Sequence, residues 1–288
     1  MALANVLLEL VLIVATMLVT ATLVIVGPRA IVAAVRDVRW RLDQCLLPFA
    51  ALAAVLLVRW STQDVVQRLE RGVLRNNITP YLFEIDRALF DPVAVLQSFQ
   101  TEALTSFFVF VYIYGYAFLI LFPFVAYFAL EEMEELSTLV LAVIANYGIG
   151  LIFYTLFIAF GPRNVDPLVF EGLLYDAFPQ SRELTNEINR NTNVFPSLHT
   201  SLAMTMFFLA WVTREKYPLW LPVAGILAIS VGLSTMYLGI HWFSDVVAGM
   251  ALALVSVYIG VNYTVAGIAG SVRRFFETRF GSPRVDGE

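Results

Sequence analysis

Long apolar stretches separated by short polar ones run along the whole chain. A membrane helix needs about 20 consecutive apolar residues, and most of these stretches reach that length. Short segments of alternating hydrophobicity, typical of a membrane β-barrel, are absent from the sequence. We predict an all-α fold, a polytopic membrane helix bundle of about seven transmembrane helices. The predicted spans are Leu3–Val26, Cys45–Val58, Leu104–Leu130, Leu136–Phe160, Leu198–Val212, Leu219–Leu238 and Phe243–Ile268.

The second span is short and contains Pro48, and a long segment of mixed polarity, Ser61–Thr101, follows it. Within that segment, Ser61 to Asp64 reads as a helix start, and apolar residues then recur at helical spacing. Asp91 precedes a proline, a favoured early position in a helix, and predicts a second short helix there. We expect both to be amphipathic helices at the membrane interface.

Basic residues cluster at alternate ends of the predicted spans, in Arg29–Arg41, Arg214–Lys216 and Arg273–Arg279. By the positive-inside rule these segments are cytoplasmic, which places the N-terminus outside. The chain is then expected to be a multi-pass protein of the cell membrane. The predicted divisions are N-terminal spans with the external amphipathic segment (1–103), a catalytic transmembrane core (104–270) and a cytoplasmic tail (271–288).

Only 14% of the residues are charged, against about a quarter in a soluble domain, and the net charge is −5. An acidic chain of this kind argues against nucleic acid as a partner. The single cysteine, Cys45, excludes an intrachain disulfide and a cysteine-based metal site. We expect no cofactor and no metal.

The chain has two histidines, and the orientation above places both on the external side. His241 and Asp245 are four residues apart, so they share one face if the last span begins near Trp242. A carboxylate there can hold one ring nitrogen and leave the other free to act as a nucleophile. A helix cap beside a solvated histidine is the alternative.

His199 falls in the first turn of a span, with Pro196 and a capping Ser197 before it. The N-terminus of a helix offers unpaired N–H groups that suit a phosphate, and a histidine beside it can protonate a leaving oxygen. A simple cap with an incidental histidine is the alternative. Arg163 ends another span on the same side and suits bidentate phosphate binding, although an arginine at a span end often serves only topology.

In order, the chain has an arginine after one span, Pro-Ser-Leu-His at 196–199, and serine, histidine and aspartate at 234, 241 and 245. Over roughly Leu136–Ile268 this resembles the superfamily of type 2 phosphatidic acid phosphatases, which also includes the vanadium haloperoxidases. The resemblance implies metal-independent phosphoryl transfer through a phosphohistidine on the external face. The implied roles are attack by His241, orientation by Asp245, proton donation by His199, and phosphate binding by Arg163, Ser197, Leu198 and Ser234.

Three positions depart from the family pattern. Leu156 stands in place of a lysine, Leu198 in place of a glycine and Thr235 in place of an arginine. The motif forms are more similar to the branch that contains the inositol phosphorylceramide synthases. Two enzymatic functions therefore stay open: a phosphatase acting on a phospholipid or polyprenyl phosphate, and a lipid phosphotransferase that moves a phospho-headgroup between membrane lipids.

A transporter or a non-enzymatic scaffold is the third hypothesis. Transporters often place ionisable groups at the middle of the membrane. In this chain, charged residues within the predicted spans are almost absent, and Glu9 is the exception. The predicted site lies instead at the membrane edge, which favours an enzyme. The sequence leaves the oligomeric state open.

Overall fold

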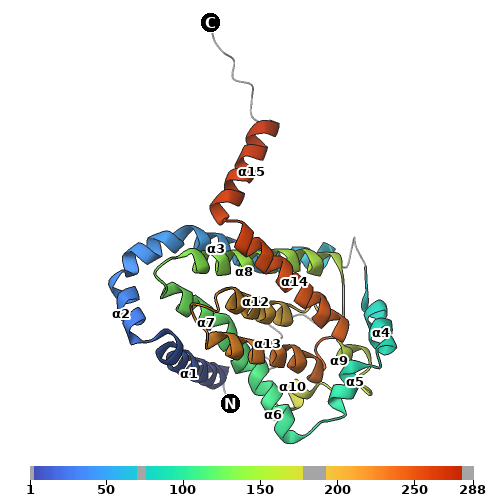
Figure 1. Cartoon of the computed structure of the whole chain (residues 1–288). Helices are drawn as coiled ribbons and strands as arrows, with labels where there is room; N and C mark the ends of the chain where they lie inside the picture. Colours follow the sequence, from blue (N-terminus) through green and yellow to red (C-terminus); the bar gives the residue numbers. More distant parts are fainter. Residues whose placement is uncertain (1–2, 70–75, 178–192, 281–288) are drawn as a thin grey trace.

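The fold is taken from a computed structural model of the chain, which describes residues 3–69, 76–177 and 193–280. Figure 1 shows a helix bundle with α12 in the middle, surrounded by α7, α8, α13 and α14, all of which contact it. The N-terminal helices lie along one side of the bundle, and α15 projects away from it. The helices are α1 (Leu3–Ala21), η1 (Thr22–Val26), α2 (Pro28–Arg36), α3 (Val38–Leu69), α4 (Thr79–Ala88), α5 (Pro92–Gln97), α6 (Glu102–Phe110), η3 (Val111–Gly115), α7 (Tyr116–Phe128), α8 (Glu134–Leu156), α9 (Pro162–Val165), α10 (Leu173–Ala177), α12 (Leu198–Val212), α13 (Trp220–Tyr237), α14 (Phe243–Asn262) and α15 (Val265–Phe280).

The predicted all-α membrane bundle is confirmed. Among the described residues, six helical stretches are long and apolar enough to cross a membrane, and α12 is a shorter apolar helix of 15 residues. At 1.5 Å per residue, α12 is about 22 Å long, less than the hydrocarbon core of a bilayer. In the described part of the chain, the bundle therefore has six candidate spans and one shorter central helix, where seven similar spans were predicted.

Polar side chains hold the central helix to α8. Asn146 donates from Nδ2 to the hydroxyl oxygens of Ser201 and Thr205, at 2.6 and 3.1 Å. All three residues are fully buried. A hydrogen bond that is shielded from water is costly to lose, because the polar groups would then be buried without partners. This contact therefore fixes the rotation of α12 about its own axis.

The second span differs from the prediction. Helix α3 begins at Val38, seven residues before the predicted start, and its candidate span covers Val38–Val58. The earlier start brings Arg41 into the bundle, where its guanidinium donates to the carbonyl oxygens of Phe128, the last residue of α7, and of Leu130 just after it. The separate helix predicted to start at Ser61 is wrong, because α3 continues without a break to Leu69.

Two other boundaries also move. The span predicted to end at Phe160 stops at Leu156, and the chain then runs extended beside residues 76–78 and 193. The last predicted span ends at Asn262, where Tyr263 adopts an extended conformation and α15 starts as a new helix. The prediction of a short helix after Asp91 is confirmed by α5.

Helices α8 and α14 approach closely at Gly260, where an added Cβ would lie 2.7 Å from the carbonyl oxygen of Thr138. We expect Gly260→Ala to lower the free energy of unfolding by about 1–3 kcal/mol, because the backbone must move apart. Gly148→Ala in α8 is the matched control, since nothing lies within 4 Å of its added Cβ. Thermal unfolding in detergent should show a lower Tm for the first variant alone; equal effects would contradict this packing.

Candidate active site

The turn between α13 and α14 carries His241. The amide groups of Ile240 and His241 both donate to the carbonyl oxygen of Thr235, at 2.9 and 3.1 Å. Gly239 has a φ of +70°, and a side chain there would collide with the backbone of Glu171. The turn therefore requires glycine at that position, and it leaves His241 only 3% exposed.

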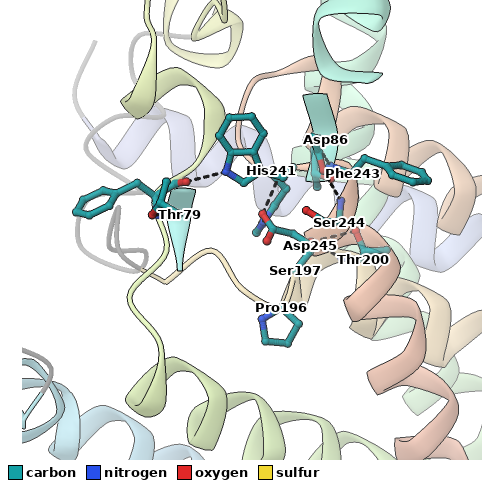
Figure 2. A network of polar contacts seen from close by, with 12 residues as sticks. Thr79, Asp86, Pro196, Ser197, Thr200, His241, Phe243, Ser244 and Asp245 are labelled. Carbon is teal, nitrogen blue, oxygen red and sulfur yellow. Dashed lines mark hydrogen bonds and ion pairs between the residues drawn. The ribbon is translucent and has the colours of Figure 1, made fainter. Parts of the chain in front are cut away.

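Asp245 lies beside His241 in the first turn of α14 and is fully buried (Figure 2). The distance from its Oδ2 to Nδ1 of His241 is 3.6 Å, and the same oxygen accepts the amide N–H of Trp242 at 2.9 Å. A distance of 3.6 Å is too long for a hydrogen bond, and the contact is an ion pair only when His241 carries a positive charge. The pair is thus aligned in the resting site, and catalytic hydrogen bonds often tighten only when substrate binds.

His199 faces His241 from the first turn of α12. The two ring centroids are 6.2 Å apart. Ser197 caps this helix by accepting the amide N–H of Thr200 at 3.3 Å, and its own amide donates to the carbonyl oxygen of Asp245 at 3.1 Å. The two histidine motifs are therefore joined directly through their backbones.

Arg163 lies on α9, which begins directly after Gly161. Its amide donates to the carbonyl oxygen of Gly239 at 3.2 Å, so it is tied to the turn that carries His241. The pKa of His241 is lowered to about 3, mainly by burial and also by the positive charge of Arg163, while a backbone hydrogen bond to Val194 acts in the opposite direction. The imidazole is therefore neutral at physiological pH, which is the form a nucleophile needs.

Two of the predicted phosphate-binding residues have structural contacts. The side chain of Leu198 is buried and packs where Gly150 has no side chain; a Cβ there would lie 2.6 Å from Cδ2 of Leu198. Ser234 is fully buried in α13, and its hydroxyl donates to the carbonyl oxygen of Val231 at 2.7 Å. The structure thus gathers His241, Asp245, His199, Ser197 and Arg163, while Leu198 can offer the site its backbone amide.

Asp86 is a site residue that sequence reasoning missed. It lies on α4, is 1% exposed, and accepts the amide N–H groups of Phe243 and Ser244 at 2.6 and 3.0 Å (Figure 2). These amides belong to the first turn of α14. One signal was available: Asp86 is four residues after Leu82 and shares the buried face of an amphipathic helix. An acidic residue on an apolar face indicates a specific partner.

The segment before the third span braces the site at two more points. The hydroxyl of Thr79 accepts the amide N–H of Phe160 at 2.9 Å, and the carbonyl of Phe160 accepts the indole N–H of Trp242 at 2.8 Å (Figure 2). Gln97 donates from Nε2 to the carbonyl oxygens of Glu171 and Tyr237, both at 2.9 Å. Residues 79–97 therefore hold the α8–α9 connection and the turn after α13 in place.

The N-termini of α12 and α14 meet at the site but are satisfied differently. Two carboxylates, Asp86 and Asp245, accept amide groups at the start of α14. At the start of α12 the capping group is the neutral hydroxyl of Ser197. The first amide groups of a helix have no carbonyl partner within it, and they carry the positive end of the helix dipole. The start of α12 is therefore the place in this site where an anion is favoured.

Among the residues that the structure describes, no group of three or more His, Cys, Asp and Glu side chains could hold a metal ion.

The fold and these contacts define a polytopic helical membrane protein with a buried histidine–aspartate pair that faces a second histidine. A sequence profile of the PAP2 superfamily matches residues 80–259, and the chain belongs to this family. The chain is also 25% identical over 155 residues to phosphatidylglycerophosphatase B of Bacillus subtilis (strain 168), covering 48% of this chain and 72% of the relative. No solved structure matches. The predicted family and enzyme class, a phosphoric ester hydrolase, are confirmed, whereas the closer likeness to the inositol phosphorylceramide synthases stays a prediction.

The Asp86 cap can be tested by substitution. We expect Asp86→Ala to lower the free energy of unfolding by about 1–2 kcal/mol and to reduce turnover, because two amides lose their acceptor beside the His241–Asp245 pair. Asp86→Asn keeps one oxygen acceptor and should retain more of both. Asp91→Asn is the matched control, since Asp91 precedes α5 without a side-chain cap bond. Thermal unfolding and phosphate release would measure both effects, and an unchanged Asp86→Ala protein would contradict the cap.

The pH dependence of stability follows from the shifted pKa of His241. Its value in the fold, about 3, is below the ordinary 6.5, so the unfolded chain binds the proton more tightly. The stabilisation is complete above about pH 6.5 and is lost as the pH falls toward about 3. We expect the Tm to fall between about pH 7 and about pH 4, and to fall less steeply in His241→Asn. Equal slopes of Tm against pH in wild type and His241→Asn would contradict this prediction, because they would show that folding does not change the pKa of His241.

Proposed function

We propose that this protein is a membrane lipid phosphatase that hydrolyses a lipid phosphate or diphosphate through a phosphohistidine. The observation that carries the proposal is the neutral, buried His241, held beside Asp245 and opposite His199 at the start of α12. This arrangement supplies a nucleophile, a group that orients it, a proton donor and an anion site in one place.

In the first step, an imidazole nitrogen of His241 attacks phosphorus and the bond from phosphorus to the lipid oxygen breaks. The ring gains positive charge as the N–P bond forms. Asp245 faces Nδ1 from 3.6 Å and stabilises that charge, which also directs attack through the other nitrogen, Nε2. A neutral imidazole is available for this step across the physiological pH range.

His199 completes the proton balance. In its protonated form it gives a proton to the departing lipid oxygen, which leaves as an alcohol. The neutral His199 then takes a proton from a water molecule that attacks the phosphohistidine. The N–P bond breaks, inorganic phosphate leaves, and both histidines return to their starting states.

Phosphate binding falls to Arg163 and to the start of α12. The guanidinium provides a charge suited to two phosphate oxygens, and the backbone amide of Leu198 at the start of α12 provides a further donor, since the amide of Ser197 already donates to Asp245. This set carries fewer cations than the family pattern, because Leu156 and Thr235 replace a lysine and an arginine. The Bacillus subtilis relative is by its name a phosphatidylglycerophosphatase, which supports a glycerophospholipid phosphate as the substrate and water as the acceptor.

The proposed orientation places the site outside the cell. Arg41 and Lys216 lie near the opposite ends of the spans from the histidines, where they contact the segment after α7 and Glu135. Basic residues at that end of the bundle agree with a cytoplasmic location under the positive-inside rule.

The test compares wild type with His241→Ala in detergent with EDTA. The substrates are phosphatidic acid, phosphatidylglycerophosphate, a polyprenyl diphosphate, and phosphatidylinositol with an acceptor lipid alcohol. We expect wild type to release phosphate in EDTA, and the variant to lose at least about a thousandfold in rate while it keeps its Tm. Alkaline quenching with a radiolabelled substrate should trap label on His241, because phosphohistidine is stable in alkali.

Three results would contradict the proposal. Wild-type rates in His241→Ala would remove the nucleophile from this site. Loss of activity in EDTA would indicate a metal-dependent reaction. A new lipid carrying the headgroup, formed without free phosphate, would make the enzyme a phosphotransferase and not a phosphatase.

A further inference from the structure

Two tyrosine rings contact His199. The ring centroids of Tyr112 and Tyr116 each lie 4.9 Å from that of the imidazole, with interplanar angles of 31° and 48°. Both tyrosines belong to the stretch Glu102–Phe128, which precedes every motif of the site. The proton donor is therefore contacted by a helix to which the sequence motifs assign no role.

The two tyrosines stand at a break in helix type. Tyr112 lies in the π-helix η3, and Tyr116 is the first residue of α7. A π turn inserts an extra residue into a helix, and such turns are frequent at functional sites. Tyr112 is also buried in a cluster with Phe108 and Tyr237, so packing restricts the movement of its ring.

Aromatic rings suit the task of a proton donor in two ways. Their faces attract an imidazolium, which favours the protonated side chain that the first step needs. Their bulk also limits rotation of the histidine, whose nitrogen must come within about 3 Å of the leaving oxygen. Flexible aliphatic side chains would provide neither effect.

We propose that Tyr112 and Tyr116 are positioning residues whose rings hold His199 toward His241 for protonation of the leaving group. The inference rests on the proposed function, in which His199 is the general acid. It predicts an effect that depends on the leaving group. A lipid alkoxide needs a proton in order to leave, whereas a nitrophenolate leaves readily without one.

The experiment measures kcat and KM for dioctanoyl phosphatidic acid and for p-nitrophenyl phosphate in detergent. We expect Tyr112→Leu and Tyr116→Leu to lower kcat for the lipid by about tenfold or more and kcat for the aryl phosphate by less than about twofold. KM should change little for either substrate. Tyr112→Phe and Tyr116→Phe keep the rings and should restore the lipid rate.

Tyr114→Leu is the matched control. Tyr114 lies in the same π-helix, but its hydroxyl donates to Glu9 on α1 at 3.0 Å. Any general disturbance of η3 should therefore lower both rates by the same factor in this variant. A similar uniform loss in Tyr112→Leu would overturn the positioning role.

The His199→Ala variant distinguishes failure of the positioning role of the two tyrosines from failure of the proposed function, in which His199 is the general acid. If His199→Ala lowers both rates equally, the acid role in the proposed function fails. If it lowers the lipid rate selectively while the Tyr→Leu variants do not, only the positioning role fails. If the Tyr→Phe variants lose as much lipid activity as the Tyr→Leu variants, the hydroxyls act and the ring proposal is overturned.

Discussion

The site depends on the contact between the start of α12 and the first turn of α14. The amide of Ser197 donates to the carbonyl oxygen of Asp245, and Gly249 allows the approach, since a Cβ there would lie 2.5 Å from the carbonyl oxygen of Ser197. This contact sets the separation of the two histidines. Because both helices are backed by α8, a shift at one histidine cannot occur without disturbing the bundle.

The two helix N-termini that meet in this contact differ in the charge of their capping groups. The carboxylates of Asp86 and Asp245 neutralise the start of α14, while the start of α12 is capped by a hydroxyl. A second carboxylate at α12 would repel a phosphate, and an uncapped α14 would compete for it. The arrangement directs an anion to the side where His199 stands, and burial together with Arg163 keeps His241 neutral on the other side.

Local sequence predicted the apolar helices and the residues His199, His241 and Asp245 that the structure brings together, because apolar run length and motif spacing are properties of neighbouring residues. Contacts between distant segments were not predictable in this way. Asp86 meets α14 across 157 positions, and Tyr112 and Tyr116 meet His199 from another helix. The start of α3 at Val38 was missed for the same reason. The early start places Arg41 inside the bundle, and its hydrogen-bond acceptors there are carbonyl groups of residues 128 and 130, which are distant in the sequence.

The shortness of α12 has a consequence for how a lipid arrives. The helix is about 22 Å long, about 8 Å less than the hydrocarbon thickness, so both of its ends cannot reach the headgroup layers. The turn after it holds Lys216, which is 40% exposed and paired with Glu135. If Lys216 is at the headgroup layer, the end that carries His199 is recessed into the hydrocarbon. Under the proposed function, a phosphate bound there would lie below the plane of neighbouring headgroups, and a lipid substrate would enter sideways from its leaflet with its acyl chains still in the bilayer.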